Sequence, residues 1–193
     1  LPVWHAQEHL DSARKRYQSC ENHLGVKLWF DVSLLRVFPD AQYATQWSER
    51  ILEQHPVSAF IENCTEGDWH TSISAPFGVG RIRSAGWVDV QLLVEKSREF
   101  WQRKKAWFSR HWCFDDGCPD GFDAVMDCRG VGAKSDLLRF GLEVRPNQGE
   151  VLTLSVPEDV GDETVNNITW AMPVAPGKVR IGSTYRWDLM EAQ

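Results

Sequence analysis

The 193-residue sequence lacks several features that would assign it quickly to a class of protein. It has no apolar run long enough to cross a bilayer and no segment resembling a secretory signal. Basic residues are not in excess, since 21 Lys and Arg stand against 27 Asp and Glu, for a formal net charge of −6. Because nucleic-acid binding normally requires a basic surface, we expect neither a nucleic-acid partner nor a membrane partner.

The cysteines are irregularly spaced. The five cysteines form no disulfide framework, which favours reduced thiols and a cytoplasmic location. A short window offers one imidazole and three thiols but no CxxC spacing, so we expect no metal and keep a zinc-stabilised structural domain as an alternative. The residues in that window are His111, Cys113, Cys118 and Cys128.

Sequence signatures of nucleophilic catalysis are also missing. No G-x-S-x-G motif occurs, and the Ser, His and Asp residues follow no familiar arrangement. The paired carboxylates Asp115–Asp116 and Glu158–Asp159 lie in turn-like segments, where solvated side chains are the simpler interpretation. The catalytic residues therefore stay unknown from the sequence.

The first half of the chain carries helical patterns. Apolar residues recur at steps of three and four from Ala6 to Leu24, and Gly25 ends the predicted helix. A second helix is predicted from Pro39–Asp40 to about residue 55, and a third after Asp89. For the third helix the pattern predicts a buried face of Val90, Leu93, Val94, Ser97 and Trp101.

Strand-like segments alternate with these helices and fill the second half. Residues 27–38 predict a strand with a bulge near Leu34–Leu35, residues 57–61 a short strand, and residues 75–86 a turn-rich connection. Further strands are predicted at residues 107–114, 124–128, 143–155, 164–173 and 178–187, the last two joined by the turn Ala175–Pro176–Gly177. The fold class predicted is α+β, with a mixed, largely antiparallel sheet and helices on one face.

The segment Asp127–Ser135 is the strongest candidate for a binding site. Its glycines lie between a predicted strand and a short helix, where backbone can approach a ligand closely. It is not a dinucleotide fingerprint, because Ser135 occupies the third glycine position, and it is not a phosphate loop, because Ala133 precedes Lys134. Taken alone, such a segment is more often an ordinary structural strand-to-helix turn than a binding site.

Three motifs in a fixed order change that interpretation. They are Asp123-Ala124-Val125-Met126-Asp127-Cys128-Arg129-Gly130-Val131-Gly132-Ala133, then Val144-Arg145-Pro146-Asn147-Gln148-Gly149-Glu150-Val151-Leu152, then the hairpin from Thr169 to Tyr185. Together they resemble the D-amino-acid-oxidase-like superfamily of FAD-dependent oxidoreductases. The resemblance is clearest over residues 122–187 and loose before residue 66.

The resemblance implies roles by position. Gly130, Val131, Gly132 and Ala133 would lie against FAD, Gly182 would approach the flavin end of the pocket, and Trp170 and Met172 would face a small-molecule substrate. Trp170 and Met172 alternate along one strand and so share a face, although both could equally be core residues. The family's G-x-G-x-x-G segment and its C-terminal closing segment are not in this sequence.

The resemblance also implies an organisation and an activity. Residues 1–121 would be a helix-rich part of the substrate domain, 122–140 a strand-loop-helix of the FAD-binding part, and 141–193 antiparallel strands of the substrate domain. The chain would be a portion of an enzyme that oxidises an amine or amino-acid-like molecule by hydride transfer to flavin, the cofactor carrying the electronic step. We expect the chain alone to be inactive and to bind FAD weakly or not at all. A non-catalytic binding module is the alternative, and the oligomeric state stays open.

Overall fold

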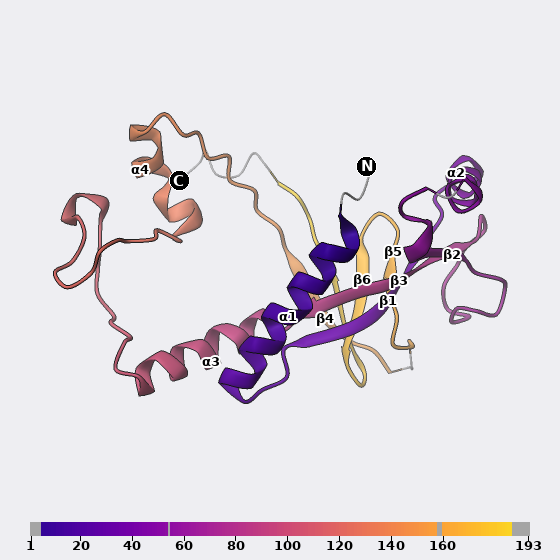
Figure 1. The fold of residues 1–193 in the computed structure, drawn as a ribbon. Coiled ribbons are helices and arrows are strands. Elements are labelled where there is room, and N and C mark those ends of the chain that lie inside the picture. The colour runs from indigo at the N-terminus through magenta and orange to yellow at the C-terminus, as the bar shows by residue number, and fades with distance from the viewer. Residues whose placement is uncertain (1–4, 54, 158–159, 187–193) are drawn as a thin grey trace.

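A computed structural model describes residues 5–53, 55–157 and 160–186. Its described residues form seven strands in one sheet, in the order β2-β3-β1-β5-β6-β7-β4. Neighbouring strands are antiparallel except β1 and β5, which are parallel. The predicted α+β class with a mixed, largely antiparallel sheet is therefore confirmed (Figure 1).

The helices begin and end where local chemistry predicts. α1 runs Ala6–Leu24 and ends at Gly25, whose φ of 71° suits glycine. α2 runs Ala41–Leu52, and α3 runs Val90–Arg103. The carboxylates of Asp40 and Asp89 accept hydrogen bonds from backbone N–H groups in the first turns of α2 and α3. The three predicted helices are confirmed, α2 ending slightly earlier than expected.

The centre of the sheet is the long pair β1 (Trp29–Val37) and β3 (Val79–Val88). Its register shifts between Val32 and Leu34, which confirms the predicted bulge to within a residue or two. The turn-rich segment predicted at residues 75–86 is confirmed only for residues 75–78, where the Gly78 backbone N–H donates to the Ala75 carbonyl, and is wrong from Val79 onward, where β3 begins. Gly80 and Gly86 lie inside β3 because indole rings cover them: a Cβ on either would come within 2.3 Å of Trp47 or Trp29.

The remaining strands are shorter than predicted. Residues 58–60 form a 3-10 turn before β2 (Ile61–Asn63), so the strand predicted at 57–61 lies slightly later. β4 is Val151–Ser155, and the single strand predicted at 164–173 is two, β5 (Thr164–Asn166) and β6 (Trp170–Ala175), separated by a tight turn. β7 (Lys178–Gly182) pairs with β6 as the predicted hairpin, while Trp187 lies outside the described residues.

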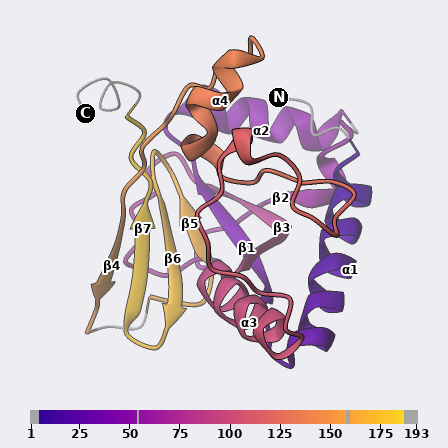
Figure 2. The ribbon, with the colours of Figure 1, turned by 90° about the vertical axis from the view of Figure 1, so that its left-hand side faces the viewer.

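Two small clusters form the core of the sheet region. Leu35, Val37 and Val79 pack together, and Phe38 and Trp47 pack with Ile61 where α2 meets the sheet. At the other end, α1 lies beside α3, with Tyr17 stacked on Trp29 and His23 edge-on to Phe100 (Figures 1 and 2). None of the described helices is long and apolar enough to cross a membrane.

The buried face predicted for α3 is rotated from the expected one. Leu93 and Ser97 are half-buried as predicted, together with Leu92 and Phe100, which the prediction omitted. The other three residues of the predicted face are exposed: Val90 by 61%, Val94 by 51% and Trp101 by 48%. The helix packs against α1, and this contact selects a neighbouring stripe of the helix.

Residues 104–150 differ from the rest of the chain. They leave the end of α3, run out beyond the sheet and return through α4 (Lys134–Arg139) to β4 (Figure 1). The strands predicted at residues 107–114 and 124–128 were wrong, since within the described chain neither segment has a strand to pair with. The helical structure of residues 104–150 consists of two 3-10 turns, Phe114–Asp116 and Gly130–Ala133, and of α4, which follows the second turn.

Candidate functional site

The glycine segment forms an exposed ledge that leads directly into α4. Gly130, Val131 and Gly132 are exposed, and Ala133 is buried. Gly130 has a φ of 59°, which disfavours other residues, and a Cβ added there would meet nothing within 4 Å. A Cβ on Gly132 would touch only the Cβ of Arg129, at 3.6 Å. We call residues 130–133 the ledge, and the backbone of its first three residues, 130–132, is open to a flat ligand.

Arg129 braces the ledge from its N-terminal side. Its Nε and Nη2 donate to the two carboxylate oxygens of Asp127, at 3.0 and 2.7 Å, and its backbone N–H donates to the same group at 3.0 Å. Nη2 also donates to Asp136 of α4 at 2.6 Å. A planar guanidinium suits this forked arrangement, so Arg129 ties Asp127, which precedes the ledge, to the helix after it.

These contacts change the acid–base behaviour of the group. The side-chain hydrogen bonds from Arg129, and then its backbone N–H, lower the pKa of Asp127 to about 2. The same carboxylates raise the pKa of Arg129 further above its ordinary range. Both groups are therefore charged at any physiological pH, and the brace is permanent under those conditions.

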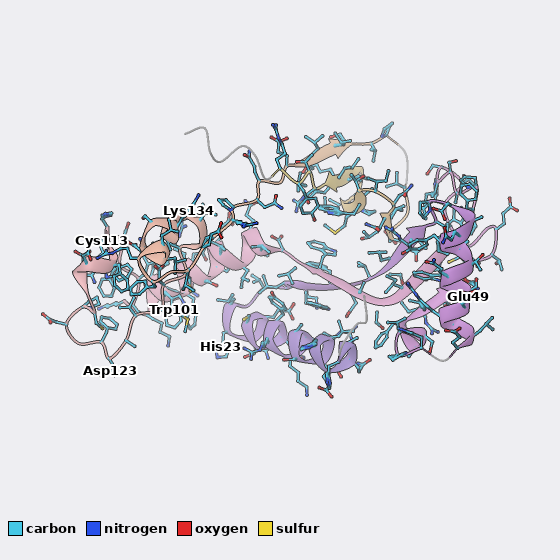
Figure 3. The ribbon with its side chains drawn as sticks, turned by 90° about the horizontal axis from the view of Figure 1, so that it is seen from above. His23, Glu49, Trp101, Cys113, Asp123 and Lys134 are labelled. Atoms are coloured by element: carbon cyan, nitrogen blue, oxygen red, sulfur yellow. The ribbon has the colours of Figure 1, made fainter. Side chains whose placement is uncertain are left out.

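A lobe of residues 112–117 packs against the outer side of the brace. The guanidinium carbon of Arg129 lies 5.2 Å from the centre of the Trp112 ring, while the Trp112 indole N–H donates to the carbonyl of Gly117 at 3.0 Å. Arg139 pairs with Asp115 at 2.9 Å. Figure 3 shows Cys113, Asp123 and Lys134 together at this end of the molecule, far from Glu49 on α2.

The second part of the predicted site is on the sheet. Trp170 pairs with Gly182 across β6 and β7, and Met172 pairs with Arg180, so the side chains of Trp170 and Met172 leave the same face of the sheet. Both are half-buried, whereas a place deep in the core would bury them fully. We call the face that carries Trp170 and Met172 the platform. Their proximity to substrate stays a prediction.

Gly182 is explained by packing within the sheet. A Cβ there would come within 2.9 Å of the Val151 side chain and 3.2 Å of the Glu150 carbonyl oxygen. The absence of a side chain therefore lets β4 lie against β7. The predicted approach of Gly182 to a flavin stays a prediction, since strand packing already requires glycine at this position.

The residues present fit a flavin contact at the ledge better than an anion site. α4 has only six residues, and its first turn is continuous with the 3-10 turn of the ledge, so it offers no free helix start to a phosphate. The exposed, side-chain-poor backbone of 130–132 fits the flat surface of a flavin ring system. The division into parts at residues 121 and 140 stays a prediction.

The thiols do not assemble a metal centre. Within the part of the chain that the structure describes, no three His, Cys, Asp or Glu side chains gather closely enough to hold a metal ion. The Cys118 thiol donates instead to the carbonyl of Phe122 at 3.2 Å, and the Cys113 backbone N–H donates to Asp116 at 2.7 Å. The zinc alternative therefore gains no support from the geometry.

The sequence reasoning named the ledge but missed its brace. The Asp127-x-Arg129 spacing stands inside the quoted motif and could have suggested a local carboxylate–guanidinium pair. Asp136 lies seven residues after Arg129, beyond the 3-10 turn, so its spacing carries a weaker signal. No sequence signal points to Trp112, because the loop that brings it beneath Arg129 follows no regular period.

Three solved oxidase structures share the fold of this chain. Glycine oxidase from Geobacillus kaustophilus superposes with a TM-score of 0.71 at 15% identity, covering 94% of this chain and 55% of that one. Iminodiacetate oxidase from Chelativorans sp. BNC1 gives 0.73 at 16% identity, with 98% and 58% covered. Glycine oxidase from Bacillus cereus ATCC 14579 gives 0.63 at 14% identity, with 94% and 56% covered.

These likenesses confirm at the level of the fold the resemblance that the sequence motifs implied. The chain spans a little over half the length of the oxidase structures that it matches. No protein-family model matches the sequence. No curated protein matches it at the level of sequence.

Proposed function

We propose that this chain is the larger part of the substrate domain of an FAD-dependent oxidoreductase, together with one contact strip for the flavin. The intact protein would oxidise an amine or amino-acid-like small molecule by hydride transfer. The single observation that carries the proposal is the superposition of 94–98% of the chain on glycine and iminodiacetate oxidases. Since one fold can host many activities, the ledge and the platform must supply the chemical argument.

The ledge would hold the cofactor by backbone contact. FAD, when bound, supplies the two-electron acceptor. Gly130 and Gly132 leave room for its ring system, and Arg129, fixed by Asp127 and Asp136, keeps the ledge in one conformation before binding. A preformed ledge lowers the ordering cost of binding, which is the physical benefit of the brace.

The platform would position the substrate. Trp170 and Met172 present half-buried apolar surface on one sheet face, and such surface excludes water from a small bound molecule. No pair of described side chains forms an acid–base arrangement at this face, so the contribution of this chain is orientation of the reacting carbon. The rest of the protein would complete the enclosure.

The absorption spectrum of the intact purified protein tests the proposal. We expect visible flavin bands, and we expect glycine or iminodiacetate, tried as candidate substrates, or a related amine to bleach them without oxygen. Anaerobic bleaching reports hydride transfer whatever the final electron acceptor is. A colourless protein that does not take up added FAD would overturn the proposal and favour a non-catalytic binding module.

A ledge variant makes the test specific. Gly132→Val places a side chain on the exposed backbone, and it should weaken FAD binding about tenfold or more if the flavin lies within contact distance. The unfolding free energy of the flavin-free protein is the control, because the nearest atom to a Cβ at Gly132 is at an ordinary 3.6 Å. Unchanged FAD affinity would place the flavin elsewhere.

A further inference from the structure

The outermost strand β4 leaves one edge of the sheet open. β4 is the last strand in the sheet order, and within the described structure it pairs on one side only, with β7 (Figure 2). All five of its residues, Val151–Ser155, are exposed, among them Leu152 by 63% and Leu154 by 41%. The backbone N–H and C=O groups along such an edge can bind another strand.

The direction of the backbone shows which groups are free at this edge. The Val156 N–H donates to the Gly177 carbonyl at 2.9 Å, so Val156 directs its backbone groups toward the β7 side. Because this direction alternates along a strand, Leu152 and Leu154 also direct theirs toward β7. Three residues of β4 therefore direct N–H and C=O away from the sheet, namely Val151, Thr153 and Ser155.

This edge lacks the features that keep a strand from pairing with other chains. Charged residues, prolines, bulges and short length protect sheet edges. Val151–Ser155 has neither a charged residue nor a proline, and its register with β7 has no shift. The opposite edge strand, β2, has only three residues and carries Glu62 at its centre, which pairs with Arg81. One edge of the sheet is thus protected, and the other is suited to pairing.

The sequence of β4 is complementary to itself. If two copies lie antiparallel with Thr153 opposite Thr153, then Val151 lies opposite Ser155 and Leu152 opposite Leu154. Every outward residue then meets an outward residue, and each such pair exchanges two backbone hydrogen bonds. A shift by one residue would place outward residues opposite inward ones and lose these bonds. The leucine pairs would cover apolar surface on the face away from the platform.

We propose that β4 binds β4 of a second copy of this chain about a twofold axis, so that two sheets become one. A second copy fits because the strand is uncharged and matches its own length and register, as a self-complementary interface requires. Thr153 is opposite Arg180, and Arg180 is opposite Met172, so both platforms lie on the same face of the joined sheet. The pairing does not depend on flavin.

Light scattering and amide hydrogen exchange on the full 193-residue chain test the pairing. The mass should approach twice that of one chain as the concentration rises toward millimolar. The amides of Val151, Thr153 and Ser155 should become protected with dimer formation, whereas those of Leu152 and Leu154 should be protected at every concentration. A chain that stays monomeric overturns the proposal. A dimer with freely exchanging outward amides also overturns it and places the contact elsewhere.

A pair of charge variants tests the register. Thr153→Lys places like charges directly opposite each other and should raise the dimer dissociation constant about fivefold or more, as should Thr153→Glu. Mixing the two variants should restore dimers, because lysine then faces glutamate. Thr71→Lys adds the same charge at an exposed turn outside β4 and should change the dissociation constant less than about twofold. A mixture that stays monomeric, or an equal effect of Thr71→Lys, would contradict the pairing.

The intact protein separates this inference from the proposed function. A colourless protein that dimerises with protected outward amides would remove the proposed function and keep the pairing. A monomeric intact protein in which Val151, Thr153 and Ser155 are already protected would assign the edge to another strand of the same chain, and this outcome would overturn the pairing whether or not flavin is bound.

Discussion

The sheet with α1 to α3 and the segment 104–150 are held together in different ways. In the sheet, fully buried Leu28, Leu35 and Val79 and the tryptophan-covered glycines form a packed interior. In the segment, Ala133 is the only described hydrophobic residue that is buried, and many large apolar side chains are exposed. These are Trp107, Phe108, Phe114, Phe122, Val125, Met126, Val131, Leu138, Phe140 and Leu142.

This difference indicates which part of the chain is stabilised by its own packing. The sheet region stabilises itself by hydrophobic burial, while the segment relies on charged and aromatic contacts around Arg129. Exposed apolar surface on this scale is typical of a region that packs against another part of a protein. The chain covers only 55% and 58% of the two oxidase structures, which agrees with this interpretation.

The largest expected difference in unfolding free energy between the two regions comes from removing one large aromatic ring in each. Trp47 is 4% exposed, so Trp47→Ala should lower the unfolding free energy by about 3–5 kcal/mol. Phe108 is 69% exposed, and Phe108→Ala should change it by less than about 0.5 kcal/mol. Urea unfolding measures both. Equal losses would show that the segment is as well packed as the sheet.

A smaller effect is expected from adding one methyl group in each region. In Gly80→Ala the new Cβ would lie 2.3 Å from the Trp47 ring, and the required repacking should cost about 1–3 kcal/mol. Gly132→Ala meets only an ordinary contact and should cost less than about 0.5 kcal/mol. Thermal or urea unfolding of the two variants decides the matter, and the reverse order of stability would contradict the described packing.

Acid should loosen the segment before the sheet. The pKa of Asp127 is lowered to about 2 in the folded chain, against about 3.9 for an unfolded Asp. The stabilisation from this carboxylate is therefore present above about pH 4 and is lost as the pH falls toward 2. Asp127→Asn should already show reduced protection of residues 127–136 at pH 5, as measured by hydrogen exchange against wild type at the same pH.

A matched substitution controls for charge. Asp120 forms no hydrogen bond or ion pair in the described structure, so Asp120→Asn should leave the exchange of residues 127–136 unchanged. If wild type and Asp127→Asn exchange alike between pH 5 and pH 2, the brace around Arg129 does not stabilise the ledge.

The sequence predicted best those elements that depend on local chemistry. Gly25, Asp40 and Asp89 mark helix ends because capping needs only neighbouring residues, and the 175–177 turn sets the β6–β7 hairpin in the same way. β3 was missed because its glycines are explained only by Trp47 and Trp29, which come from distant positions. The strands expected before the ledge require partner strands, which no local pattern supplies.

In the candidate site, too, the sequence predicted what depends on local motifs and missed what depends on long-range contacts. The ledge at 130–133 could be named from its glycines and from the order of the surrounding motifs. Arg129 and Trp112 could not be assigned roles, because the contacts of Arg129 with Asp136 and with the Trp112 ring arise from the fold. Long-range contacts, and not residue type, make these side chains candidates.

Hydrogen exchange of the intact protein with and without FAD tests the central claim most directly. The account predicts that FAD slows amide exchange across residues 130–133 and leaves the core around Leu35 and Val79 unchanged. Flavin that binds without slowing exchange at 130–133 would contradict it.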